Sequence, residues 1–269
     1  MISAKWSILG LLCISIVGCA LHGGNPMNEL ARENSEGFEA FDTPRTFHGP
    51  GTILRRSSNG TVYLVGKIDN IIITGEETFP EIRRTKSMKI GSLMKTIGIG
   101  QLPVGFSLQV DNAVEVEISA FNGKREMIDD GYLLKLDGFF RDRPKVSGSE
   151  YFIIRETISS LEIQIKSSES QLIDWGANIG TADLAESSGS IALEGDSAVI
   201  FSNTYDSPRK ILYKPERLTF IEKRTPSVQT RGVSPRGAEP SQLKVTAKKV
   251  TRGEFLIPEK VISDKTADR

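Results

Sequence analysis

Alternating apolar and polar residues run through much of the chain after residue 106. Residues 114–118 and 161–166 carry an apolar side chain at every second position, which is the period of a strand with one buried face. Residues 191–194 and 198–202 flank Gly195-Asp196, and this pattern predicts a hairpin. Further apolar runs predict strands at residues 132–140, 151–154, 210–213, 218–222, 243–250 and 254–257.

The first half of the chain carries a second hairpin pattern and two helix candidates. Residues 51–56 and 61–68 enclose Ser57-Ser58-Asn59-Gly60, and Asn-Gly is a strong hairpin signal because both residues tolerate a positive φ. Residues 70–74 would add a third strand to this meander. Helices are expected at residues 27–33, directly after Pro26, and at residues 85–97. The whole pattern predicts a β-rich α+β fold, with a mostly antiparallel sheet and a few short helices.

The first 18 residues form a segment of different character. Lys5 is followed by a run of apolar or small residues from 6 to 18. About 13 residues are too few to cross a hydrocarbon core of about 30 Å, whereas a basic start and a short apolar run are typical of a secretory signal peptide. We therefore expect residues 1–18 to be a signal peptide.

The end of this segment, Ile16-Val17-Gly18-Cys19, resembles the lipobox of bacterial lipoproteins. The resemblance implies cleavage before Cys19 and acylation of its thiol, which would hold the protein on a membrane of the bacterial cell envelope. Ala20 follows the cysteine in place of Asp, and this favours the outer membrane, on its periplasmic side, over the inner membrane. The alternative interpretation is a noncleaved anchor helix with a coincidental cysteine.

Composition divides the remaining chain into three regions. We expect residues 19–41 to be a lipidated tether, residues 42–222 a β-rich globular domain, and residues 223–269 a basic tail with Pro and Gly that is partly ordered at 243–257. The chain as a whole has no net charge, but residues 222–269 carry 11 Lys or Arg residues against 6 Asp or Glu residues. Such a tail can dock on an acidic body or contact anionic lipid or an envelope polymer.

Turn density and charge indicate two candidate binding surfaces, the loop at residues 44–51 with the strand after it, and residues 244–252. Their candidate binding residues are His48, Arg55, Arg56, Lys248, Lys249 and Arg252. The expected partners are the membrane, reached through the lipid on Cys19, and an envelope protein or polymer. We expect no nucleic acid, no metal and no cofactor.

The residue inventory argues against an enzyme. Cys13 would leave with the signal peptide and Cys19 would take the lipid, and the two histidines are His22 and His48. Zinc hydrolysis and Cys-His catalysis therefore lack their ligands and their nucleophile. Ser92-Leu93-Met94-Lys95 matches a Ser-x-x-Lys nucleophile pattern, but the pattern is loose and no suitable Lys-Thr-Gly follows it.

Carboxylates offer a weaker alternative chemistry. A glycosidase pair or a calcium site needs oxygen ligands of this kind, and the candidates are Asp129, Asp130, Asp137 and Asp142. Asp129-Asp130-Gly131 is more simply interpreted as a hairpin turn.

Two classes of function remain. The first is a membrane-anchored envelope lipoprotein that acts by noncatalytic binding or structural contacts. The second is a membrane-active, pore-forming-like β protein, because residues 160–204 supply alternating strands separated by Gly- and Ser-rich turns, as an inserting amphipathic hairpin requires. An ordinary half-buried sheet explains the same alternation, and an envelope enzyme of unknown reaction is the third possibility.

Overall fold

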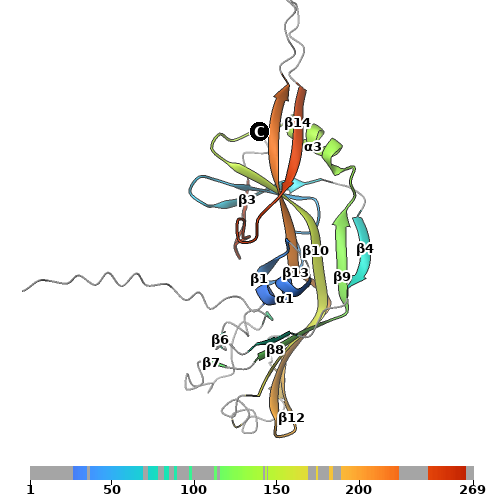
Figure 1. Ribbon diagram of the computed structural model, residues 1–269, viewed down its shortest axis with the longest axis vertical. Helices are drawn as coiled ribbons and strands as arrows, with labels where there is room; N and C mark the ends of the chain where they lie inside the picture. The colour runs from blue at the N-terminus through green and yellow to red at the C-terminus, as the bar shows by residue number, and fades with distance from the viewer. Residues whose placement is uncertain are drawn as a thin grey trace, which may run out of the picture.

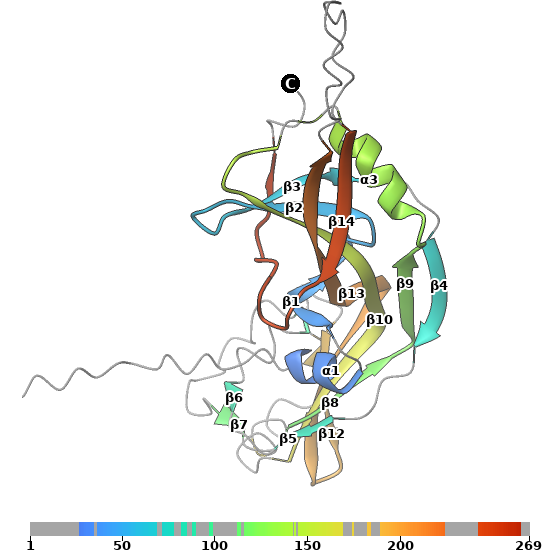
Figure 2. The same ribbon diagram turned by 45° about the horizontal axis from the view of Figure 1, so that its top comes forward.

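Two long antiparallel strands form the axis of the molecule (Figures 1 and 2). β10 (Glu150–Ser167) and β13 (Ala198–Lys223) are paired from Tyr151 opposite Leu218 to Ser167 opposite Val199. The register shifts at three places along this pair, and such irregularities bend a strand. The separate strands predicted at residues 151–154 and 161–166 are therefore parts of β10.

The computed structural model describes the following residues: 27–34, 37–68, 72–77, 82–84, 88–89, 97–98, 112–113, 116–141, 143, 145–168, 174, 182–183, 189–223 and 242–264. Within them the structure is β-rich, with one 13-stranded sheet that is mostly antiparallel. This confirms the β-rich, mostly antiparallel prediction.

Both long strands have several neighbours in the sheet. β10 pairs with β2 (Thr52–Arg56), β9 (Gly123–Ile128) and β8 (Val116–Phe121). β13 pairs with β14 (Gln242–Lys249), β1 (Glu39–Arg45) and β12 (Gly189–Glu194). β3 (Val62–Lys67) pairs with β2, and β15 (Ile262–Ser263) lies on the far side of β3. The other outer strands are β4 (Ile72–Glu77) beside β9, β5 (Ile82–Arg84) beside β8, and β11 (Ala182–Asp183) beside β12. Among these described pairs only β15 with β3 is parallel, and β6 (Met88–Lys89) and β7 (Asn112–Ala113) form a separate small sheet.

The apolar side chains gather in three clusters along the axis. The first lies beneath helix α1 (Met27–Asn34) on strands β8, β10, β12 and β13. The second lies between helix α3 (Tyr132–Arg141) and the β13–β14 pair. The third joins β2 and β10 to the segment after β14, where the Phe255 ring stacks on Phe152 with 3.8 Å between ring centroids.

Residues 132–140 form helix α3, so the strand predicted there is wrong. Tyr132, Leu136 and Phe140 are buried at intervals of four residues, which is the period of a helix face. The Asp129 carboxylate accepts the Gly131 N–H at 2.7 Å, and the backbone carbonyl of Asp129 accepts the Tyr132 N–H. Asp129-Asp130-Gly131 is therefore the turn that starts α3 and not a hairpin turn.

The boundary between tether and domain is also corrected. The predicted helix at residues 27–33 is confirmed as α1, but Met27 and Ala31 are each only 1% exposed, and Phe38 and Phe41 are core residues. Residues 27–34 and 37–41 thus belong to the folded body. Burial of these apolar side chains stabilises the fold, whereas in a solvated tether they would be exposed to water.

The other local expectations have mixed outcomes. The hairpin of β2 and β3 is confirmed, and Gly60 adopts the expected positive φ of 84°. The strand expected at residues 70–74 occurs as β4, but it pairs with β9 and does not extend that hairpin into a meander. Of the helix expected at residues 85–97, only residues 88–89 and 97 lie within the described residues, and residues 88–89 form β6. Residues 254–257 run as an irregular segment and not as a strand. A few short helices were expected, and the described residues contain two, α1 and α3.

Candidate functional site

One face of the sheet is continuously apolar at the end where β8, β10, β13 and β12 pair, which is the lower end in Figure 1. Ile118 of β8 lies opposite Ile165 of β10, which lies opposite Phe201 of β13, and Phe201 in turn lies opposite Ile191 of β12. All four side chains are 0–2% exposed. Directly opposed residues point to the same face, so they form a row across four strands. We call these four strand segments the two-faced sheet: residues 116–121, 161–167, 189–194 and 198–204.

The opposite face of the two-faced sheet is mostly polar, although Phe121, Ala192 and Ile200 also lie on it. The neighbouring row has a polar residue on every strand, and it consists of Ser119, Gln164, Ser202 and Ser190. Each of them is half-buried. The Ser190 and Ser202 hydroxyls are 2.7 Å apart, and Lys166 forms an ion pair with Glu194. The hairpin predicted from residues 191–202 is confirmed, with Gly195 in its turn at φ 58°.

The apolar face is covered by groups from elsewhere in the chain. Met27 and Ala31 of α1 belong to its cluster, and so does Ile97. The Ile97 carbonyl accepts hydrogen bonds from the Asn203 amide at 2.7 Å and from the Tyr205 hydroxyl at 2.8 Å. These two bonds hold the Ile97–Gly98 turn on β13. The cover therefore combines apolar burial with two specific hydrogen bonds.

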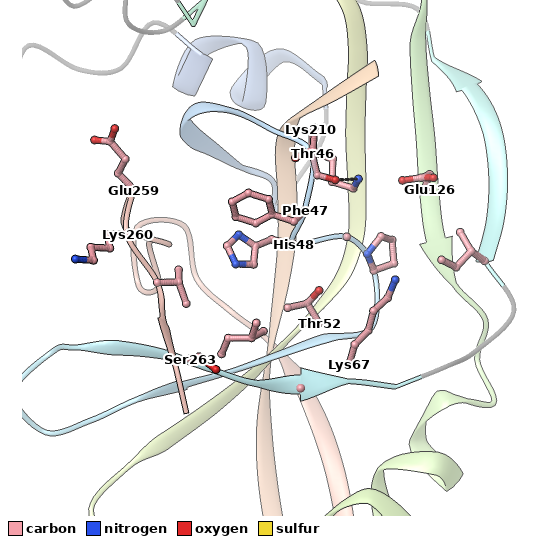
Figure 3. Close-up of a pocket in the computed structure, with 16 residues that line it drawn as sticks. Thr46, Phe47, His48, Thr52, Lys67, Glu126, Lys210, Glu259, Lys260 and Ser263 are labelled. Atoms are coloured by element: carbon pink, nitrogen blue, oxygen red, sulfur yellow. Dashed lines mark hydrogen bonds between the residues drawn. The ribbon is translucent and has the colours of Figure 1, made fainter. Parts of the chain in front are cut away.

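A cavity of about 710 Å³ lies beside the turn-rich loop at residues 46–50 (Figure 3). Phe47 and His48 lie at its centre, and β15 and the segment before it close one side. The Lys210 ammonium donates to the Thr46 carbonyl at 3.0 Å. Charged residues of both signs line the cavity, namely Lys67, Glu126, Lys210, Glu259 and Lys260.

His48 serves this loop as a structural residue and not as an exposed contact. It is only 7% exposed and has a φ of 64°. Arg45 Nη1 lies 3.1 Å from His48 Nδ1, and because a guanidinium can only donate, the imidazole nitrogen accepts. Burial, together with the charges of Arg45 and Lys210, lowers the pKa of His48 to about 4. The ring is therefore neutral at pH 7.

The other two residues of this predicted surface are also held in internal contacts. Arg55 is 6% exposed, and its Nε donates to Asp264 at 2.8 Å. Arg56 donates from Nε to Glu150 at 2.9 Å and from Nη1 to the Glu254 carbonyl at 2.6 Å. Both arginines thus bind residues 254–264 to the hairpin of β2 and β3. The sequence did not indicate this docking because the partners lie about 200 positions away.

The second predicted surface is exposed. Lys248, Lys249 and Arg252 lie at the solvent-facing end of β14 and in the turn after it. Arg252 Nη2 donates to the Ala31 carbonyl of α1 at 3.3 Å. Lys249 and Arg252 also line a cavity of about 390 Å³ with Arg32, Gly37, Lys214, Pro215 and Val250. The candidate residues of the first predicted surface are therefore held in internal contacts, whereas those of the second are exposed.

The remaining candidates either fall outside the described residues or have structural contacts. Cys19, His22, Ser92, Lys95 and Asp142 lie outside them. Asp137 accepts the Val245 N–H at 2.6 Å and so ties α3 to β14. In the described part of the chain no group of three or more His, Cys, Asp or Glu residues is arranged to hold a metal ion. Neither described helix is long and apolar enough to span a bilayer.

Comparisons with known proteins identify no family. No protein-family model matches the chain, and no curated protein sequence matches it. Among solved structures, the chain is similar to a bacterial gasdermin from Bradyrhizobium tropiciagri, with 12% sequence identity and a TM-score of 0.49 over 86% of this chain and 90% of that one.

Proposed function

We propose that this chain is a membrane-active β protein that acts on a lipid bilayer without catalysis. The observation that carries the proposal is the two-faced sheet. Ile118, Ile165 and Phe201 lie in register on one face, and Ser119, Gln164 and Ser202 lie in register on the other. A sheet that meets acyl chains on one face and water on the other needs this alternation.

The backbone of these strands meets the other requirement of a bilayer. In hydrocarbon every N–H and C=O group needs a partner within the protein, and β10 is paired along both of its edges. A tilted strand crosses a bilayer in about 9–11 residues. The segments of the two-faced sheet contain 6 or 7 residues each, so insertion would also take in adjoining residues of β10 and β13, which contain 18 and 26 residues.

Insertion would require the cover of the apolar face to leave. The cover consists of α1 and the Ile97–Gly98 turn, which contribute the buried side chains of Met27, Ala31 and Ile97. The two hydrogen bonds to the Ile97 carbonyl add about 1 kcal/mol each. The covered structure is then a storage form in which the apolar face is shielded from water.

The proposed location is the bacterial cell envelope, with the outer membrane favoured. The lipobox-like residues before Cys19 support lipid anchoring, which would keep the two-faced sheet close to a bilayer. The anchor would only concentrate the protein at the membrane. The proposed anchoring is therefore separate from the proposed insertion of the two-faced sheet.

A dye-release assay tests the activity. In vesicles of bacterial phospholipid, the full chain should release the dye, and Leu193→Lys should reduce the rate at least tenfold. Leu193 packs against the apolar cluster, and a lysine facing lipid costs about 2–4 kcal/mol at mid-bilayer. Ala192→Lys is the matched control on the other face of β12, and it should stay within twofold. Absence of release by the unmodified chain at all protein-to-lipid ratios would refute the proposal.

A second candidate function is noncatalytic binding of an acidic envelope protein or polymer. It is favoured by the exposed cations Lys244, Lys248 and Arg252, which lie on and after β14. Crosslinking of the native protein in its envelope should then recover a specific acidic neighbour. Recovery of bulk lipid alone would contradict this binding function.

A further inference from the structure

The cavity beside α1 is lined by positive charge from three separate parts of the chain. Arg32 comes from the last turn of α1, Lys214 from β13, and Lys249 and Arg252 from the end of β14 and the turn after it. Among the described residues no Asp or Glu lines this cavity. We call it the basic cavity, and its volume of about 390 Å³ lies in the range of small-ligand sites.

The fold holds these cations near one another. Arg252 donates to the Ala31 carbonyl, one residue before Arg32. Lys214 is fixed by its 3.0 Å bond to Glu156 and by its position 5.6 Å from the centre of the Phe38 ring. Because the four charges sit on three packed parts of the chain, their backbone positions cannot separate without loss of core contacts.

The carboxylates around the basic cavity already have partners. Glu156 accepts from both Lys214 and Arg125, and although burial opposes ionisation, these two bonds hold the pKa of Glu156 below its ordinary value. Glu39 accepts the Gly253 N–H. Burial raises the pKa of Glu39, against the Gly253 bond and the charge of Arg252, which lower it. Among the described residues that line the cavity, the charged side chains are all cations.

A glycine leaves room at the wall of the basic cavity. Gly37 has a φ of 88°, and a Cβ built on it would lie 3.6 Å from Cε of Lys214. An L-residue with a side chain would be strained at this φ, although the 3.6 Å separation from the lysine is itself an ordinary contact. The wall at this point is therefore backbone and lysine, which a small anion can approach closely.

We infer that the basic cavity binds the phosphate monoester group of a ligand. A phosphate monoester carries a charge of about −1.5 to −2 at pH 7 and three acceptor oxygens. Two guanidinium groups and two ammonium groups supply matching donors, and Arg binds phosphate in a bidentate manner. The ligand is either a soluble phosphomonoester or a lipid headgroup that ends in one. This inference does not rest on the proposed membrane activity.

Calorimetry on the full chain at low ionic strength tests the inference with glycerol 3-phosphate as the soluble probe. Flotation with phosphatidylcholine vesicles containing phosphatidic acid tests the lipid source, and phosphatidylglycerol, a diester, is the charge control. The unmodified chain should bind glycerol 3-phosphate, or it should prefer phosphatidic acid to phosphatidylglycerol at least tenfold. The first result indicates a soluble ligand and the second a headgroup.

The variants separate the cavity from general basic charge. K249Q/R252Q should weaken binding at least tenfold, and R32Q, on a different element, should weaken it in the same assay. K244Q/K248Q is the matched control, since both lysines are exposed on β14 outside the cavity, and it should stay within twofold. Thermal unfolding of each variant confirms that it is folded. Equal loss in the control pair, or no binding of either probe by the unmodified chain, would overturn the inference.

Discussion

At the scale of single residues, His48 shows how a loop residue acquires a structural function. Its positive φ and its acceptor role toward Arg45, three residues earlier, are local features, whereas the nearby charge of Lys210 is tertiary. A His between Phe47 and Gly49 is consistent with an exposed turn, and we predicted a contact surface there. Nothing in the local sequence indicates that Arg45 and Lys210 would surround the ring, because Lys210 comes from β13.

Acid should destabilise the protein through His48. The pKa of His48 is lowered from 6.5 to about 4 in the folded state, first by burial and then by Arg45 and Lys210. The unfolded chain takes up a proton that the folded chain refuses, so stability falls as the pH drops from 6.5 to 4, by at most about 3 kcal/mol. Urea unfolding at pH 7 and pH 4.5 measures this difference.

His48→Asn is the control for that measurement. Asn tolerates a positive φ and does not titrate. The difference in unfolding free energy between the two pH values should therefore shrink by about 2–3 kcal/mol in this variant. An unchanged difference would assign the acid sensitivity to other groups.

At the scale of elements, local patterns were informative where one period dominated. The hairpins at residues 52–67 and 189–204 were predicted because glycine turns separated clear alternation. Helix α3 was missed because the run after Gly131 is apolar at nearly every position, so the strand and helix periods both fit it. The buried interval of Tyr132, Leu136 and Phe140 was the signal that could have revealed the helix.

The segment after β14 should contribute strongly to stability although it has little regular structure. Phe255 is 0% exposed, stacks on Phe152, and its carbonyl accepts the Tyr213 hydroxyl. Phe255→Ala should lower the free energy of unfolding by about 3–5 kcal/mol. Leu256 is 57% exposed, so Leu256→Ala should change it by less than about 0.5 kcal/mol. Chemical denaturation of both variants checks this, and equal effects would contradict the docking of residues 250–264.

At the scale of the whole molecule, the sequence predicted strands but not their order in the sheet. β10 alone contacts four different strands, and β2, its partner, lies about 100 residues before it. Pairing at such distances depends on which apolar faces match. The two-faced sheet was therefore visible from sequence only as separate alternating strands. Of the cations of the basic cavity, only Lys249 and Arg252 were visible, as part of the tail charge.

The proposed membrane anchoring would be a property of the whole chain and would depend on one thiol. In the bacterial envelope Cys19→Ala should abolish labelling with radioactive palmitate and shift the protein from the membrane fraction to the soluble fraction, because the several acyl chains that would hold it are lost. Cys13→Ala is the matched control and should leave both unchanged. Retention of label and membrane fractionation by Cys19→Ala would disprove lipid anchoring at this residue.

Insertion of the two-faced sheet is the central claim, and site-specific fluorescence tests it most directly. The chain has two cysteines, Cys13 and Cys19, so both are changed to Ser and one new cysteine carries an NBD fluorophore. The probe replaces either Leu193, on the apolar face of β12, or the adjacent Ala192 on the polar face. With vesicles present, we predict a blue-shifted, several-fold brighter emission at position 193 and little change at 192. Equal responses at the two positions, or no response at 193, would contradict it.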